Sequence, residues 1–231
     1  MLLAIDTSGF FCSVALFDRQ ESTILIEKSE KIGHRHWHTE SIIPLLEEVL
    51  IKTGYSWNSV NHVVCITGPG SFTGLRVGLA TARGLALGLG ITSSGVSVFQ
   101  AFSCYDKGKY PLAVLLDAKR SEIWLQVFDK RRNPLCDPRI VLIKDVLDSV
   151  VSVLTPTDNS PIGLAGSGSR IAFREGFKKR DLHSSQSLTV VNELVSPPIS
   201  SAVEFASLHL SMDLPLRPLY LRAPDASRQN L

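Results

Sequence analysis

The residues whose types and spacing most clearly suggest a binding or catalytic site lie in a glycine-rich loop in the first half of the chain. Gly68 and Gly70 follow a strand-like apolar run, and Ser71 and Thr73 open a helical pattern directly afterwards. The first N–H groups of a helix have no intrahelical partner and attract phosphate, so this pattern is one way to build an anion site. A P-loop is excluded, because the motif lacks its lysine and Arg76 is the only cation of the loop.

Close packing is the other interpretation of the same glycines. Gly74, Gly78 and Ala82 recur every four residues along the helical pattern, and Gly84 and Gly88 repeat that spacing on a second face. A glycine inside a helix costs about 1 kcal/mol relative to alanine, and this cost is difficult to explain unless a neighbour approaches the bare face closely. We therefore favour close packing over phosphate binding for this segment.

Two carboxylates follow strand-like apolar runs. Asp6 ends the run that starts at Leu2, and Asp117 ends the run that starts at Leu112. In α/β folds the carboxyl ends of strands face the ligand crevice, so both side chains are candidates for positioning magnesium or phosphate. Turn capping explains both positions equally well. The phosphate alternative, a vestigial phosphate loop, comprises Asp6, Gly68, Gly70, Ser71, Thr73 and Asp117.

Three histidines and two short basic runs offer weaker signals. His34, His36 and His38 alternate, so in an extended segment their side chains point the same way, as a metal chelate requires. No carboxylate or cysteine has a matching local spacing, and we prefer a polar link before a helix. The basic runs at 130–132 and 178–180 are expected to be solvated turns, with RNA contact as the less favoured alternative.

An α/β arrangement is predicted to position these residues. The first half alternates three strands, a helix, a strand, the glycine loop with its helix, and another strand; the second half repeats this plan. Short turns join the early strands and helices join the later ones, so each sheet is predicted to be mixed. The predicted strands are 2–6, 11–17, 23–27, 62–67, 91–94, 111–116, 122–128, 139–143 and 162–165, and the predicted helices are 39–52, 73–89, 144–154 and 200–210.

Composition limits the class of protein. The 231 residues are 44% hydrophobic and only 20% charged, so the chain can bury a core without metals or disulfides, and disorder is excluded. The longest apolar runs fall far short of the ~20 residues of a membrane-spanning helix. A net charge of +2 lacks the basic bias of a chain that grips nucleic acid alone. The four scattered cysteines indicate neither a zinc site nor a disulfide framework, which favours a cytoplasmic protein.

Four stretches of the sequence resemble the TsaB (YeaZ) family, whose members are accessory subunits of the bacterial machinery that makes threonylcarbamoyladenosine in tRNA. Together they span the chain, and the second half between them matches more loosely. The stretches are LAIDTS at 3–8, HTESIIPLL at 38–46, GPGSFTGLRVG with ARGLA at 68–86, and PLYLRAPDA at 218–226.

The resemblance implies an actin-like/sugar-kinase-like fold (ASKHA, ribonuclease H-like) of duplicated domains with mixed sheets. It predicts an N-terminal subdomain at 1–105, a C-terminal subdomain at 106–211, and a tail at 212–231 that packs back on the first subdomain. The expected partners are the larger paralogue TsaD, which transfers the threonylcarbamoyl group to the adenosine next to the anticodon, and the ATPase TsaE. Without TsaD, a homodimer through the same surface is expected.

A non-catalytic role is expected within this family. The TsaD paralogue carries a metal-binding H-x-x-x-H after the strand that follows its glycine helix, and the matching stretch here, 95–102, contains no histidine. The resemblance therefore assigns ATP or ADP and the metal to partner subunits, with no cofactor in this chain and tRNA contacted only indirectly. Two alternatives stay open: an actin-like ATPase or phosphotransferase that uses Asp6, Asp117 and the Gly68-Pro69-Gly70 loop, and a glycoprotease-like metallopeptidase.

The resemblance to the family places the partner contact on the two helices of the N-terminal half, which are expected to pack as a bundle with the equivalent helices of the partner. The sequence supplies an apolar stripe on the first helix and a bare face on the second. An exchange of Gly78 for leucine is expected to block the contact. The predicted partner-binding residues are Ile42, Leu45, Leu46, Val49, Gly74, Gly78, Leu79, Ala82 and Arg83.

Overall fold

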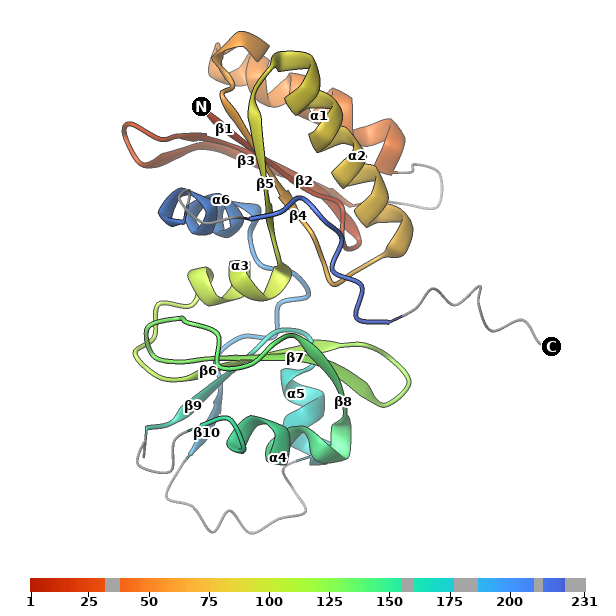
Figure 1. Cartoon of the computed structure of the whole chain (residues 1–231), viewed down its shortest axis with the longest axis vertical. Helices are drawn as coiled ribbons and strands as arrows, with labels where there is room; N and C mark the ends of the chain where they lie inside the picture. Colours follow the sequence, from red (N-terminus) through yellow and green to blue (C-terminus); the bar gives the residue numbers. More distant parts are fainter. Residues whose placement is uncertain (32–37, 155–159, 177–186, 210–213, 223–231) are drawn as a thin grey trace, which may run out of the picture. The chain divides into compact units, whose positions relative to one another are not determined.

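The computed structural model divides the chain into two units (Figure 1). It describes all residues except 32–37, 155–159, 177–186, 210–213 and 223–231. The first unit combines Met1–Ala101 with Pro198–Leu231, and the second is Phe102–Pro197. None of the described helices is long and apolar enough to cross a membrane.

The first unit is built on a five-stranded mixed sheet in the order β3-β2-β1-β4-β5. β1, β2 and β3 are antiparallel neighbours, whereas β4 is parallel to both β1 and β5. The strands are β1 (Leu2–Asp6), β2 (Phe11–Asp18), β3 (Thr23–Lys31), β4 (His62–Ile66) and β5 (Thr92–Val96), and the helices are α1 (His38–Thr53), the 3-10 helix η1 (Trp57–Ser59), α2 (Phe72–Leu89) and α6 (Ile199–Leu208). Helix α3 (Val98–Tyr105) begins in the first unit and ends in the second, which starts at Phe102.

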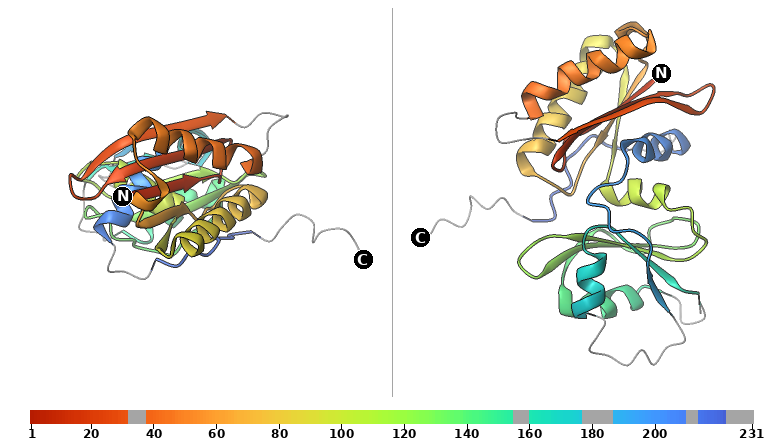
Figure 2. Two further views of the ribbon diagram at one scale, coloured as in Figure 1. Left: turned by 90° about the horizontal axis from the view of Figure 1, so that it is seen from above. Right: turned by 180° about the vertical axis from the view of Figure 1, so that it is seen from behind.

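The core of the first unit forms where α1 and α2 cover one face of this sheet. Side chains alternate between the two faces of a strand, so Leu3 and Ile5 point toward α1 and α2, and Leu2 and Ala4 point to the other face. Helix α6 covers that other face (Figure 2). All five residues of β1 are buried, because the strand lies at the centre of a sheet with helices on both sides.

Helix α6 differs from the sequence-based domain assignment. It was predicted to belong to the C-terminal subdomain, but it contacts β1, β2 and β4 and belongs to the first unit. The physical reason is its apolar face: Ile199, Ala202 and Ala206 are buried where the second face of the sheet would otherwise meet water. The backbone N–H of Ile199 also donates to Oε1 of Glu27 on β3 at 3.0 Å, which anchors the start of the helix.

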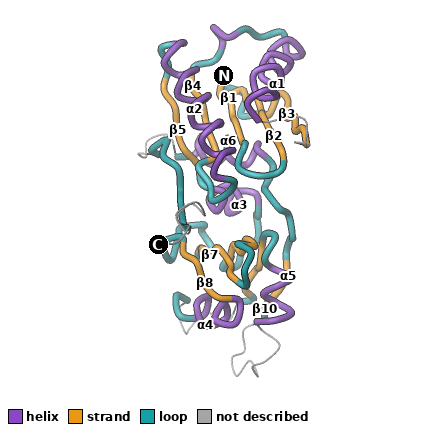
Figure 3. The backbone as a smooth tube through the Cα atoms, turned by 90° about the vertical axis from the view of Figure 1, so that its right-hand side faces the viewer, coloured by secondary structure: helices purple, strands orange, loops and turns teal. Residues whose placement is uncertain are grey.

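The second unit repeats the sheet of the first, in the order β10-β9-β6-β7-β8. Figure 3 shows the strands of both sheets in orange. Its three early strands are antiparallel, and β9 is parallel to β6 and β10. This duplication confirms the predicted actin-like class with mixed sheets. The elements are β6 (Leu112–Asp117), β7 (Glu122–Phe128), β8 (Arg139–Leu142), η2 (Ile143–Asp145), α4 (Val146–Val151), β9 (Ile162–Ala165), α5 (Ser169–Ile171), η3 (Ala172–Gly176) and β10 (Leu188–Val190).

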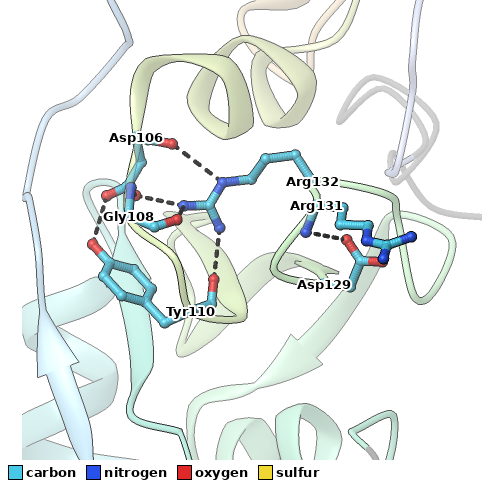
Figure 4. A network of polar contacts seen from close by, with 6 residues as sticks. All are labelled: Asp106, Gly108, Tyr110, Asp129, Arg131 and Arg132. Atoms are coloured by element: carbon cyan, nitrogen blue, oxygen red, sulfur yellow. Dashed lines mark hydrogen bonds and ion pairs between the residues drawn. The ribbon is translucent and has the colours of Figure 1, made fainter.

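Arg132, in the turn between β7 and β8, forms an ion pair and hydrogen bonds with residues at the start of the second unit (Figure 4). Its guanidinium binds Oδ1 of Asp106 at 2.6 Å and donates to the carbonyl oxygens of Gly108 at 2.6 Å and Tyr110 at 2.8 Å. The hydroxyl of Tyr110 donates to the second carboxylate oxygen of Asp106 at 3.1 Å. The expectation of a solvated basic turn is therefore wrong for Arg132, whose side chain is only 17% exposed.

Exchange of Arg132 for lysine is expected to destabilise the second unit by about 1–2 kcal/mol. A lysine retains the ion pair with Asp106, but it cannot present the planar fork that reaches both carbonyl oxygens. The corresponding change in melting temperature, a few degrees, is measurable by calorimetry. The matched control is Arg131→Lys, because Arg131 is exposed and its backbone N–H, unaffected by the exchange, donates to Asp129. Equal melting temperatures for both variants would contradict the structural role.

His62 introduces a pH dependence into the first unit. Its ring nitrogens lie 2.6 Å from Oγ1 of Thr92 and 2.8 Å from Oγ of Ser94, and the residue is 8% exposed. Burial, aided by the charge of Arg19, lowers the pKa of the His62 imidazole below its ordinary value of 6.5. The folded state therefore favours the neutral ring, so the unfolded state binds more protons once the pH falls below about 6.5.

The stability that His62 contributes is expected to be complete above pH 6.5 and to be lost as the pH falls below it. Calorimetric melting at pH 7.5 and pH 5.5 measures this loss. His62→Gln, which does not titrate, should lose less melting temperature between the two values than the natural chain does. An identical loss in both proteins would assign the pH dependence to other groups.

Candidate functional site

The glycine loop packs directly on the turn that follows β1. The N–H of Ser71 donates to the carbonyl oxygen of Ser8 at 2.7 Å, and a methyl group on Gly70 would overlap that same oxygen. Oδ1 of Asp6 accepts from the N–H of Ser8 at 2.7 Å. The carboxylate thus shapes the turn against which the loop packs, as turn capping predicts.

The first turn of α2 is tied down in the same way. Oγ of Ser71 caps the helix by accepting from the N–H of Gly74 at 3.2 Å, and Oγ1 of Thr7 donates to the carbonyl oxygen of Gly74 at 2.7 Å. Gly68, at a φ of +109°, accepts from the N–H of Val98 at 2.8 Å. The N–H groups of Ser71 and Gly74, which a phosphate cradle would offer to a ligand, are thus used within the unit, which fits the close-packing interpretation. Thr73 is exposed.

Asp117 occupies the corresponding place in the second unit. Its Oδ1 accepts from the N–H of Lys119 at 2.8 Å, and its Oδ2 lies 2.5 Å from Nζ of the same lysine. Its own N–H donates to Oγ of Ser167 at 3.1 Å. Asp117 therefore also shapes the turn that follows its strand.

The predicted docking stripe lies inside the first unit, and the prediction that it forms an outer surface is wrong. The apolar side chains of α1 are buried in the core with β1 and β2, and the bare face of α2 lies on β1 and β4. A methyl group on Gly78 would overlap Oγ1 of Thr7, so this glycine serves internal packing. The buried residues are Ile42, Leu45, Leu46, Val49, Gly74, Gly78, Leu79 and Ala82, whereas Arg83 is exposed.

A different set of residues forms the outer surface of the two helices. Leu87 is 86% exposed on α2 and Ile51 is 78% exposed on α1. Around a methyl group placed on Gly84 or Gly88 there would be no atom within 4 Å. We call Ile43 and Ile51 of α1 with Ala80, Gly84, Leu87 and Gly88 of α2 the outer patch.

The ends of the two helices bring the largest side chains of the outer patch to one edge. Both helices return from the end of one parallel strand to the start of the next, so they run in the same direction, and they contact each other (Figure 1). Ile51 and Leu87 each lie two residues before the end of their helix. The outer patch therefore combines two protruding aliphatic side chains with glycines that leave the α2 backbone accessible.

The C-terminal segment 214–222 lies against α2 and the sheet of the first unit. The carbonyl oxygen of Leu214 accepts from the N–H of Gly95 at 2.9 Å, and the N–H of Leu219 donates to the carbonyl oxygen of Thr67 at 2.7 Å. Nη2 of Arg83 donates to the carbonyl oxygen of Leu216 at 2.5 Å. The segment thereby makes one backbone hydrogen bond to β5, the edge strand of the sheet, and one to Thr67, which follows β4.

Arg76 connects the same segment to the start of α2. Its guanidinium carbon lies 3.8 Å from the centre of the Phe72 ring, and its Nε donates to the hydroxyl of Tyr220 at 3.4 Å. The rings of Phe72 and Tyr220 lie 5.0 Å apart, centre to centre. Sequence reasoning missed this contact, because nothing local links positions 76 and 220.

The buried thiols of the first unit are unreactive. Burial, with a contribution from the charge of Asp6, raises the pKa of the Cys12 thiol to about 12, and burial likewise raises the pKa of Cys65. The thiolate is the nucleophilic form, so neither residue is an activated nucleophile. Within the described ranges, no three His, Cys, Asp or Glu side chains converge on a common point. His34, His36 and the side chain of His38 lie outside the described residues, as does the run at 178–180.

Comparison with known proteins identifies the family. A family model described as "TsaD: tRNA N6-adenosine threonylcarbamoyltransferase" matches residues 31–213. The tRNA threonylcarbamoyladenosine biosynthesis protein TsaB of Haemophilus influenzae is 30% identical, covering 96% of this chain and 93% of that protein. The protein of the same name in Escherichia coli is 31% identical over 57% of this chain and 56% of its own length.

A solved structure shares the fold over nearly the whole chain. YeaZ from Pseudomonas aeruginosa superposes with a TM-score of 0.72 at 22% identity, covering 95% of this chain and 99% of that one. At this identity the likeness establishes the fold, and the family rests on the sequence relatives and the family model. The chain belongs to the TsaB (YeaZ) family.

Proposed function

We propose that this chain is the non-catalytic scaffold and activator subunit that binds the TsaD paralogue, together with TsaE, in the formation of N6-threonylcarbamoyladenosine next to the anticodon of tRNAs. Family membership supports the process, since the relatives are named for tRNA threonylcarbamoyladenosine biosynthesis. The match of 31–213 to a TsaD model supports a paralogous partner with the same two-helix layer.

The observation that carries the proposal is the outer patch. Large aliphatic side chains that are mostly exposed at the ends of two adjacent helices support the assignment of a protein contact surface. The open backbone at Gly84 and Gly88 allows a second helix layer to approach at the short end of the usual 8–10 Å range of interaxial distances. The equivalent helices of the paralogue supply such a layer. When the paralogue is missing, a second copy of this chain occupies the same patch.

Catalysis and cofactors are assigned to the partners. The stretch 95–102 contains no histidine, although the paralogue carries its metal-binding histidines there. Asp6 and Asp117 each accept backbone N–H groups of their own turns. The glycine loop between β4 and α2 is filled by contacts with the β1 turn. These features support a chain that requires no nucleotide or metal of its own, with ATP, ADP and metal held by the partner subunits in the cytoplasm.

Depletion of the protein followed by mass spectrometry of bulk tRNA tests the function. We expect threonylcarbamoyladenosine to fall, and re-expression of the natural chain to restore it. Unchanged levels of the modified nucleoside would overturn the proposal. Calorimetry of the isolated chain with magnesium-ATP separates the scaffold from an ATPase: tight binding that is lost in Asp6→Ala would favour the ATPase.

A further inference from the structure

A ridge of arginine and aromatic side chains runs along the first unit beside the outer patch. It lies where the C-terminal segment 214–222 follows α2, an arrangement that Figures 1 and 2 both show. Neither α2 nor this segment contains an aspartate or glutamate. We call the following residues the arginine ridge: Phe72, Arg76, Arg83, Arg217, Tyr220 and Arg222.

Arg76 is held in a fixed orientation at one end of the arginine ridge. One face of its guanidinium rests on the ring of Phe72, and its Nε is bound to the hydroxyl of Tyr220. Among the residues that the structure describes, no acceptor binds the two Nη groups of Arg76. An exposed guanidinium held in this way presents paired donors of the geometry that suits a phosphate.

Two further arginines extend the positive charge along the segment. Arg83 is exposed and uses Nη2 to hold the carbonyl oxygen of Leu216. The side chain of Arg217 is also exposed, and within the described part of the chain it has no acidic partner. Tyr220, 41% exposed, places an aromatic ring beside Arg76. An acidic protein would need only the positive charges for binding. Single-stranded RNA also binds aromatic rings and guanidinium planes, because its bases stack on them.

We propose that the arginine ridge binds single-stranded RNA, with the arginines on phosphates and a base stacked on Tyr220. The choice of the tRNA anticodon loop as the source of that RNA rests on the proposed function. The proposal that the arginine ridge binds single-stranded RNA does not rest on it. The family resemblance implies that tRNA is contacted only indirectly, and a net charge of +2 agrees with this expectation. Net charge is an average over the whole surface, and the ridge concentrates positive charge in one place. Indirect contact predicts no RNA binding by the isolated chain, whereas the arginine ridge predicts measurable RNA binding.

Fluorescence anisotropy of the full chain with an anticodon stem-loop RNA tests the proposal. Three exposed arginines on phosphates correspond to a salt slope of about −2, so affinity should fall about 20-fold between 50 and 200 mM salt. Arg76→Gln combined with Arg217→Gln should weaken binding about tenfold and make the salt slope shallower by about 1.4. Tyr220→Leu should weaken binding at least about fivefold with no change in slope.

A matched pair of charges elsewhere provides the control. Lys130→Gln with Arg131→Gln removes two exposed positive charges from the second unit and should leave the affinity unchanged. Absence of saturable binding at about 100 µM RNA and low salt, an equal loss in the control, or displacement of the RNA by polyglutamate at equal charge would each overturn the proposal. If the chain fails this test while its depletion still lowers threonylcarbamoyladenosine, RNA binding by the arginine ridge is refuted and the proposed function stands.

Discussion

Exchange of Leu87 for glutamate is expected to weaken association with the TsaD paralogue at least about 30-fold while the chain stays folded. Leu87 is 86% exposed and is flanked by Gly84 and Gly88, so the isolated chain loses no packing. In a complex that covers the outer patch, the new carboxylate would be buried without a partner, which costs at least about 2 kcal/mol. Calorimetric titration with the purified paralogue measures the loss. The melting temperature of the variant should equal that of the natural chain.

Leu208→Glu is the matched control for this exchange. Leu208 is 69% exposed on α6, which covers the opposite face of the same sheet. Leu208→Glu therefore also replaces an exposed leucine by a carboxylate, but outside the outer patch. Natural affinity in Leu87→Glu, or an equal loss in Leu208→Glu, would exclude the outer patch as the interface. Gly78→Leu cannot serve as the test, because a side chain at Gly78 overlaps Thr7 within the unit, so any loss of binding could follow from lower stability.

Much of the fold could be predicted from the sequence, because its elements have strong local signals. The helix predicted at 39–52 is His38–Thr53 in the structure, and the helix predicted at 73–89 is Phe72–Leu89. The helix predicted at 200–210, which is Ile199–Leu208 in the structure, shows the limit of such reasoning. Its apolar pattern predicts a helix, but it contains no information about which of two similar sheets that helix covers.

The partner surface shows a second limit of the same kind. Periodicity identifies the apolar face of a helix, and Ile42, Leu46 and Val49 form the most regular face of α1. The most regular apolar face is also the one that a sheet covers best, so it forms core. The outer patch could have been predicted from residues that break the regular pattern. Ile51 and Leu87 are large aliphatic residues outside the regular apolar face of their helices, on sides that are otherwise polar or bare.

The contacts of the C-terminal segment could not be predicted from residue types alone. Arg76 and Tyr220 are separated by 144 positions, and neither has a local pattern that specifies the other. Gly95 is similar: its neighbourhood in the sequence predicts a strand, whereas its lack of a side chain is required by residues near the C-terminus. Long-range contacts of this kind appear only when the sheet brings the two segments together.

Gly95→Ala is accordingly expected to destabilise the first unit by about 3 kcal/mol, at the upper end of the usual cost of overpacking. The N–H of Gly95 donates to Leu214, and an added methyl group would overlap the carbonyl oxygen of Pro215 and lie 2.5 Å from Cγ2 of Thr67. A backbone oxygen cannot rotate away, so the whole segment must move. Calorimetric melting should show a decrease of about 6–12 °C. Gly84→Ala, where the space is open, should instead leave stability unchanged or raise it by up to about 1 kcal/mol.

A chain that ends at residue 213 separates displacement of the segment from damage to the sheet. If the alanine acts by displacing residues 214–222, Gly95→Ala should cost much less in the shortened chain than in the full one, a coupling that a double-mutant cycle measures. An equal cost in both backgrounds would place the damage at Thr67 and contradict the role of the segment. Displacement also removes Tyr220 from Arg76, so the full-length variant should lose RNA affinity together with stability.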